Sequence, residues 1–337
     1  MSCPFLRQQP VAEGARIIRR AFRIFHVLRD RQDPLAQRDS VILERYRFSR
    51  EGVIYIINLL EPHIKCSTRR SRALTTVQTV CVALRFFASG AFLYTIGDAE
   101  NLVKSVVCRA IRKVYLALKQ CLGFFVAFPS HLRPQVVKQN LFAIAGFPNV
   151  IGAIDCTHIP IKAPPGPNEG DFVNRKGFHS VNVQMVCDSM HLITNVEAKW
   201  PGSVHDSRIF RESHLFTLFE RGKETNVRVT YFMTPFPDPN SGPQTRYIAA
   251  LARTRARIEM TFGQLKQRFQ CLKSLRVAPD RACDIIVACV ILHNIATIRK
   301  ERIPVVGMQP DDDDLQPVHL DQPSGRAARD RIVEHHF

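Results

Sequence analysis

The stretch Val150-Ile151-Gly152-Ala153-Ile154-Asp155 decides how the second half of this chain folds. Its apolar, largely β-branched residues predict a buried strand that ends in an acid. A carboxylate in that position is unusual, because burying a charge is costly unless the charge is paired or bound to a metal. Asp155 is therefore the first candidate site residue, although a residue that merely caps a turn would show the same pattern.

The segments that flank this strand differ in character. Downstream, residues 181–187 and 191–200 are β-rich and are separated by Asp188-Ser189, which predicts a hairpin. Upstream, residues 14–145 show helical spacing and few strand-like alternations. The sequence therefore predicts an α/β protein with these helices: 53–60, 76–88 stopped by Gly90, 102–119, 203–219, 248–272, 281–299 and a short one at 327–336.

A basic helix is the main feature of the first half. Gly97-Asp98 predicts a turn followed by a helix N-cap, and the next helix has an apolar stripe at Val107, Ile111, Val114 and Leu118. Its other positions carry bases, among them Lys104, Arg109, Arg112 and Lys113. A helix, a bend and a second, basic helix is a helix-turn-helix pattern. An ordinary solvated face would look the same, so both interpretations stay open here.

Positive charge is concentrated in that same half. The chain has 47 Lys and Arg against 30 Asp and Glu, a net charge of +17. Residues 1–150 hold 23 basic and 9 acidic side chains, whereas residues 151–337 hold 24 and 21. This asymmetry favours a polyanion-binding region joined to a domain with another task.

Cysteine usage and hydropathy bear on the compartment. The ten cysteines are dispersed and form no CxxC pair, which favours reduced, buried thiols; Cys289 and His293 share a helical face but have no second ligand pair. The longest apolar run, 285–296, is shorter than the roughly 18–20 residues that span a bilayer. We expect a soluble intracellular protein without membrane association.

Two further acids could join Asp155. Asp206 begins a helix after Trp200-Pro201-Gly202-Ser203, and Glu259 lies on a long helix among arginines. Carboxylates brought together from separate elements are a common way to hold Mg²⁺ for phosphoryl transfer. The plainer explanations are that Asp206 is a first-turn helix acid and that Glu259 pairs with Arg255 at i,i+4.

Several longer motifs resemble the family of Harbinger transposase-derived nucleases, which are DDE-type (Asp, Asp, Glu) endonucleases. They lie between about residues 40 and 300 and are, in order, Ile151-Gly152-Ala153-Ile154-Asp155-Cys156-Thr157-His158-Ile159, Val173-Asn174-Arg175-Lys176-Gly177-Phe178-His179-Ser180, Trp200-Pro201-Gly202-Ser203-Val204-His205-Asp206, Met233-Thr234-Pro235-Phe236, Arg257-Ile258-Glu259-Met260-Thr261-Phe262-Gly263 and Leu292-His293-Asn294.

The resemblance implies a domain organisation and a site. It implies a helical, basic region with helix-turn-helix character at 1–145 and a ribonuclease H-like nuclease domain at 146–302. The composition of residues 303–337, with Pro, the Asp311–Asp314 run and few apolar residues, predicts a flexible acidic and polar tail. Asp155 and Glu259 match catalytic acids, and Asp206 matches a further acid of the site for a divalent cation, Mg²⁺ or Mn²⁺. Arg175 and Lys176, with Asn174 and His179, match a polar stretch that either faces DNA or supports the fold.

The sequence departs from the family at one point. The family carries a further strand that ends in a Gly-Asp-Ser-Gly-Tyr type motif, which supplies the second catalytic aspartate. Here only residues 221–232 lie between Glu220 and Met233, and they contain no Asp; Glu224 is their one carboxylate. We therefore expect the nuclease domain to lack one central strand. A degenerate nuclease and a sequence missing a segment, through a gene model or splice form, explain this equally.

Two functions follow from the resemblance. One is a metal-dependent nuclease (a hydrolase) that cuts DNA phosphodiester bonds; the alternative is a catalytically inactive DNA-binding or adaptor protein derived from a transposase. The resemblance further implies a Myb-like DNA-binding protein as partner and a nuclear location, with the cytoplasm as a second one.

Overall fold

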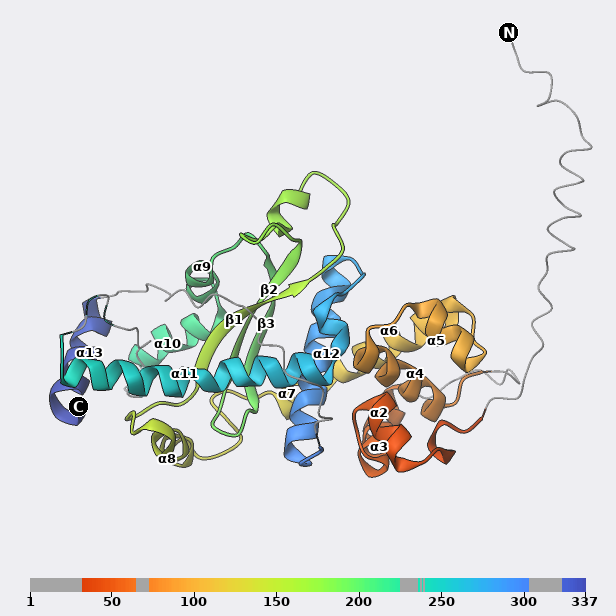
Figure 1. Ribbon diagram of the computed structural model, residues 1–337, viewed down its shortest axis with the longest axis horizontal. Helices are drawn as coiled ribbons and strands as arrows, with labels where there is room; N and C mark the ends of the chain where they lie inside the picture. Colours follow the sequence, from red (N-terminus) through yellow and green to blue (C-terminus); the bar gives the residue numbers. More distant parts are fainter. Residues whose placement is uncertain (1–31, 65–72, 225–235, 237, 239, 303–322) are drawn as a thin grey trace, which may run out of the picture. The chain divides into compact units, whose positions relative to one another are not determined.

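The sheet of this computed structural model has three antiparallel strands in chain order, β1 (Ala153–Pro160), β2 (Ser180–Cys187) and β3 (Ile193–Pro201) (Figure 1). β2 lies in the middle, and all eight of its residues are buried. Within the part of the chain that the structure describes, no strand pairs with the outer edge of β1. That part comprises residues 32–64, 73–224, 236, 238, 240–302 and 323–337.

The first strand does not end at Asp155, contrary to the prediction. β1 begins at Ala153 and continues to Pro160, so Asp155 is its third residue and lies opposite Met185 of β2. The strand continues because Thr157 and Ile159 alternate into the core while the backbone keeps its register with β2. The apolar residues 150–152 precede the strand.

The predicted hairpin is confirmed, with a longer turn than Asp188-Ser189. The Asp188 carboxylate accepts hydrogen bonds from the backbone N–H groups of Met190 and Leu192. His191 takes the left-handed conformation at φ +63°. These features close the turn between β2 and β3 before the first residue of β3.

Helices precede the sheet, as predicted. The helix predicted at 76–88 is confirmed almost to the residue: α4 ends at Ser89, and Gly90 follows in the left-handed conformation at φ +62°. Thr75 and Gln78 form a capping box at its start. The described helices are α2 (Asp39–Tyr46), α3 (Arg50–Ile64), α4 (Thr76–Ser89), α5 (Leu93–Glu100), α6 (Lys104–Gln120), α7 (Leu122–Phe125) and α8 (Pro134–Ala145), with a short 3-10 turn, η2 (Pro34–Ala36).

The turn between α5 and α6 is misplaced in the sequence prediction. Gly97 and Asp98 lie inside α5, and the chain turns at Asn101, whose φ is +53°. Gly97 is needed for close approach, because a Cβ there would lie 2.4 Å from the Leu102 carbonyl oxygen. Asp98 is not an N-cap; that position belongs to Val103, which makes no side-chain capping bond.

The elements after β1 also depart slightly from prediction. The predicted helix 203–219 is two helices, α9 (Asp206–Arg211) and α10 (His214–Glu224), separated at Glu212 and Ser213. The others are η3 (Glu169–Phe172), α11 (Pro243–Arg268), η4 (Gln270–Lys273), α12 (Pro279–Ile298) and α13 (Pro323–His336). α11 packs against β1 and β2, and α12 packs against β3 and α6 (Figure 1).

One large apolar core runs from the first helices into the sheet. It includes residues of α3, α4 and α6 together with the inner faces of β1, β2, α11 and α12. Among the described residues, α12 is the one helix that is long and apolar enough to cross a membrane by length and composition. In this structure 67% of its most apolar 18-residue stretch is buried inside the protein, and Cys289 and His293 are among its core residues.

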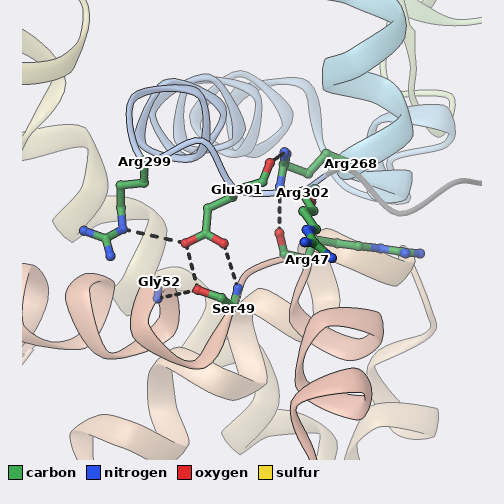
Figure 2. A network of polar contacts seen from close by, with 7 residues as sticks. All are labelled: Arg47, Ser49, Gly52, Arg268, Arg299, Glu301 and Arg302. Carbon is green, nitrogen blue, oxygen red and sulfur yellow. Dashed lines mark hydrogen bonds and ion pairs between the residues drawn. The ribbon is translucent and has the colours of Figure 1, made fainter.

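A buried arginine joins the ends of three elements (Figure 2). Arg268, the last residue of α11, is 3% exposed. Its Nη1 donates to the Arg47 carbonyl oxygen (2.7 Å), and its Nη2 donates to the Glu301 carbonyl oxygen (3.0 Å). Burial lowers the pKa of Arg268 to about 10. The guanidinium therefore ties the ends of α2, α11 and α12 together.

The end of the chain contains a packed helix. Residues 303–322, with the Asp311–Asp314 run, lie outside the described residues. α13 is longer than the short helix predicted at 327–336, and Phe337 after it packs against Phe147 and Tyr247. The tail predicted at 303–337 thus ends in a helix whose apolar residues join a small core with α11.

Candidate functional site

Asp155 and Arg255 form an ion pair between the sheet and the long helix. The Arg255 Nη2 lies 3.0 Å from the Asp155 Oδ2, and the Asp155 side chain is 10% exposed. The other carboxylate oxygen, Oδ1, accepts a hydrogen bond from the Cys156 backbone N–H at 2.9 Å. The nearly buried charge of Asp155 is therefore paired, as its position requires.

Glu259 shares the same guanidinium. It lies one turn after Arg255 on α11, with 3.9 Å between the Arg255 Nε and the Glu259 Oε1. Its side chain is 36% exposed, compared with 28% for Arg255. The i,i+4 pair that the sequence predicted is present, but the contact to Asp155 is the shorter one. One cation thus lies between two acids that are 104 positions apart in the chain.

The surroundings make both carboxylates harder to ionise. Burial raises the pKa of Asp155, and the Arg255 charge acts against that rise. Burial likewise raises the pKa of Glu259, with Arg255 lowering it and Asp155 raising it. The charge of Asp206 also raises the pKa of Asp155. Because acids near one another disfavour each other's charge, this site favours a nearby cation.

Asp206 lies at the first position of α9 with different neighbours. Its Oδ1 accepts a hydrogen bond from the Asn182 amide at 2.9 Å. The Cys156 thiol is close enough for the charge of Asp206 to act on it. Burial, and then the charges of Asp206 and Asp155, raise the pKa of that thiol well above its usual value. Consecutive strand residues point to opposite faces, so Asp155 contacts Arg255 on one face of β1 and Cys156 contacts Asp206 on the other.

The structure therefore joins Asp155 and Glu259 through Arg255, while Asp206 is held by Asn182 and acts on Asp155 only through its charge. In the described part of the chain, no three His, Cys, Asp or Glu side chains are grouped so as to hold a metal ion. The donor chemistry of Asp155 and Glu259 nevertheless fits a divalent cation. Both supply hard oxygen donors and already share a cation, and Mg²⁺ is commonly held by one or two carboxylates, with water and substrate phosphate completing its shell.

The predicted basic residues are all exposed. Lys104, Arg109, Arg112 and Lys113 lie on the solvent side of α6, whose opposite stripe is buried as predicted. Arg175 and Lys176 lie in the loop between η3 and β2 and are likewise exposed. Of the bases on α6, Lys119 is held by Asp284 of α12 at 2.7 Å.

Two residues of the polar stretch before β2 serve that loop. Asn174 is buried; its amide donates to the Ser180 hydroxyl, and its carbonyl oxygen accepts from the Lys176 and Phe178 N–H groups. His179 lies 3.1 Å from Glu169. Asn174 therefore shapes the turn that presents Arg175 and Lys176, which corresponds to the fold-supporting interpretation.

Sequence reasoning missed two buried amides that organise the domain. Asn182 holds Asp206, as described above. Asn294 of α12 accepts a hydrogen bond from the Ile193 N–H and donates to the carbonyl oxygens of Ile193 and Phe125. A usable signal was present, because an Asn whose neighbours in a strand or helix are mostly apolar must satisfy its amide inside the protein.

Comparison with known proteins identifies relatives of this chain. Residues 154–294 match the family described as DDE superfamily endonuclease. "Putative nuclease HARBI1" of Homo sapiens is 35% identical over 272 residues, which cover 77% of this chain and 78% of that protein. The Rattus norvegicus protein of the same name is 33% identical over 317 residues, 88% and 90% of the two chains. "Protein ALP1-like" of Arabidopsis thaliana is 26% identical over 281 residues, 74% and 69%. No solved structure matches the chain significantly.

Proposed function

Since this chain belongs to the family of Harbinger transposase-derived nucleases, we propose that it is a divalent-metal-dependent nuclease that hydrolyses DNA phosphodiester bonds. Endonucleases of the DDE superfamily generally use divalent metals, and DNA is the substrate expected of such a nuclease. Asp155 and Glu259 are the acids we assign to the cation.

One observation carries this proposal: Asp155 and Glu259, from β1 and α11, share the cationic Arg255. The pKa of each carboxylate is raised, and both share one guanidinium. When both acids are ionised, the trio keeps a net negative charge, which favours binding of a positive ion. When bound, Mg²⁺ or Mn²⁺ would supply Lewis-acid activation of water and stabilisation of the leaving oxygen. The chain itself holds Asp155 in place through the Cys156 N–H and shields it from water.

The remaining parts of the proposal concern the fold and the partners. We assign residues 146–302 to a ribonuclease H-like domain that lacks one central strand, supported by the outer edge of β1 having no described partner strand. We assign residues 1–145 to a DNA-binding region of helix-turn-helix character, supported by the exposed bases of α6. A Myb-like protein partner and a nuclear location complete the proposal and rest on the family alone.

Nicking of supercoiled plasmid in the presence of Mg²⁺ or Mn²⁺ tests the proposal. We expect metal-dependent nicking that both Asp155→Ala and Glu259→Gln abolish. Glu212→Gln is the matched control, because Glu212 pairs with Arg208 in an exposed i,i+4 contact at the end of α9. Asp206→Asn separates a ligand role from support of β2. Because Asn can still accept from Asn182, we expect the variant to fold and to retain partial activity if Asp206 serves only that support.

A second function is favoured by a specific observation. Arg255 already satisfies both acids, and residues 221–232 contain no Asp to replace the missing catalytic aspartate. A catalytically inactive DNA-binding or adaptor protein would have this arrangement. Salt-sensitive DNA binding without nicking in either metal would establish this second function and exclude the nuclease.

A further inference from the structure

Arg255 lies between Asp155 and Glu259, the two acids assigned to the cation. Its Nη2 contacts Asp155 at 3.0 Å, and its Nε lies 3.9 Å from Glu259. The second oxygen of Asp155 is already taken by the Cys156 N–H. The Asp155 Oδ2 that a divalent ion would bind is therefore already occupied by the guanidinium.

Electrostatics prevents the guanidinium and a divalent ion from sharing this position. Two positive charges in contact repel strongly in a partly buried site, where screening by water is weak. The carboxylates, in turn, need a counter-cation, because Asp155 is only 10% exposed and an unpaired carboxylate is costly in a buried position. One cation, the Arg255 guanidinium, already lies between them.

The Arg255 side chain is able to leave. It is 28% exposed and extends from a helix on a flexible stem, whereas Asp155 is 10% exposed and held by the strand backbone. Glu259 is 36% exposed and can follow either cation. Asp155 is thus the fixed member of the trio, and the Arg255 guanidinium can move away from it.

We propose that Arg255 is the resident counter-cation of the Asp155–Glu259 pair, and that a divalent ion enters only by displacing it. Arg255 then sets the metal concentration at which the site fills, and it keeps the acids paired when metal is scarce. This inference rests on the proposed metal site, but it concerns binding and not cleavage.

Binding of Mn²⁺ to the full-length chain, measured by electron paramagnetic resonance of the free ion, tests the inference. We expect Arg255→Gln to bind Mn²⁺ roughly tenfold more tightly than the unchanged protein, because no cation competes. Arg253→Gln is the matched control: Arg253 is exposed on the same helix and bonds the Ala249 carbonyl oxygen one turn earlier. The Arg253→Gln variant should bind Mn²⁺ as tightly as the unchanged protein. Asp155→Asn should remove the site altogether.

A thermal measurement supplies a second readout without catalysis. Without metal, Arg255→Gln should melt at a lower temperature than the unchanged chain, and Mn²⁺ should raise its melting temperature more. Should that variant fail to fold, Arg255→Lys answers the same question, since a compact ammonium cannot span both acids and should tighten Mn²⁺ binding by a smaller factor.

Unchanged or weaker Mn²⁺ binding in Arg255→Gln, or in Arg255→Lys where only that variant folds, overturns the inference. The nuclease proposal fails separately, by absence of nicking in the unchanged protein. Tighter Mn²⁺ binding without nicking would support displacement of Arg255 by the metal and exclude nuclease activity.

Discussion

Glu301 completes the N-terminal cap of a helix that begins 251 residues earlier in the chain. Its Oε2 accepts a hydrogen bond from the Ser49 N–H at 2.9 Å, and its Oε1 accepts from the Ser49 hydroxyl at 3.0 Å (Figure 2). The same hydroxyl accepts from the N–H of Gly52, in the first turn of α3. In a capping box, the third helical residue supplies the glutamate; here that position is Gly52, and Glu301 supplies the carboxylate instead.

Replacing Glu301 should therefore weaken the joint between the end of α12 and the start of α3. We expect Glu301→Ala to lower the free energy of unfolding by about 1–2 kcal/mol, the usual effect of removing a helix cap and a charge-assisted bond. Glu51→Ala, an exposed first-turn acid of the same helix, is the control and should change it by less than about 0.5 kcal/mol. Urea unfolding measures both, and equal losses would contradict the assignment.

The Glu301 carboxylate lies so close to the Gly52 backbone that it leaves no space for a Cβ atom there. A Cβ at position 52 would lie 2.2 Å from the Glu301 Oε1, so Gly52→Ala must push the carboxylate away from Ser49. We expect Gly52→Ala to destabilise the unchanged protein by about 1 kcal/mol and the Glu301→Ala variant by much less. A double-mutant cycle by urea unfolding checks this; strictly additive losses would count against it.

Asn294 should be among the most sensitive polar positions of the core. Asn294→Leu leaves the Ile193 N–H and the carbonyl oxygens of Ile193 and Phe125 without their partner, so we expect a loss of about 3 kcal/mol. Thr297→Val on the same helix is the control, because its hydroxyl bonds the His293 carbonyl oxygen one turn earlier in that helix. Thr297→Val should lower the free energy of unfolding by about 0.5 kcal/mol. Chemical denaturation at neutral pH gives both values.

His293 should make the fold sensitive to mild acid. Burial lowers its pKa from 6.5 to about 4, and its Nε2 donates to the His191 carbonyl oxygen. Since the unfolded chain binds a proton below pH 6.5 and the folded chain does not, stability is lost as pH falls from about 6.5 towards 4, by up to about 3 kcal/mol.

His293→Gln removes the titration while keeping a donor for the His191 carbonyl oxygen. We expect its unfolding free energy to fall less between about pH 7 and about pH 4.5 than that of the unchanged protein. His205→Gln, at an exposed histidine before α9, should keep the original slope. An unaltered slope in His293→Gln would assign the acid sensitivity to other groups.

The exposed bases of α6 should determine a salt-dependent affinity for DNA. Changing Arg109, Arg112 and Lys113 to Gln should weaken binding and flatten the dependence of log K on log salt by about 0.9 for each DNA phosphate that the variant no longer neutralises. Lys119→Gln is the control on the same helix, because Asp284 already holds that ammonium. Fluorescence anisotropy across a salt series gives the slopes; equal slopes in both variants would remove α6 from the interface.

The predictable elements were those encoded over a few neighbouring residues. The stripe from Val107 to Leu118 and the stop at Gly90 follow from spacing along one helix, and both are found. Asp155 and Glu259 were identifiable as acids in unusual positions. The turn near Asn101 was misplaced because a glycine in a sequence indicates a turn. Gly97 lies inside a helix instead, and the close approach of the Leu102 carbonyl oxygen explains why this position is a glycine.

By itself, the sequence determined the family, the charge asymmetry and the order of helices and strands, because each depends on residue types at short, regular separations. Only the tertiary structure decided that Arg255 lies between Asp155 and Glu259, that Asp206 turns to Asn182, and that Glu301 caps α3. These contacts join residues far apart in the chain, and packing of α11 on the sheet selects the first of them. No local pattern encodes which buried charge meets which partner.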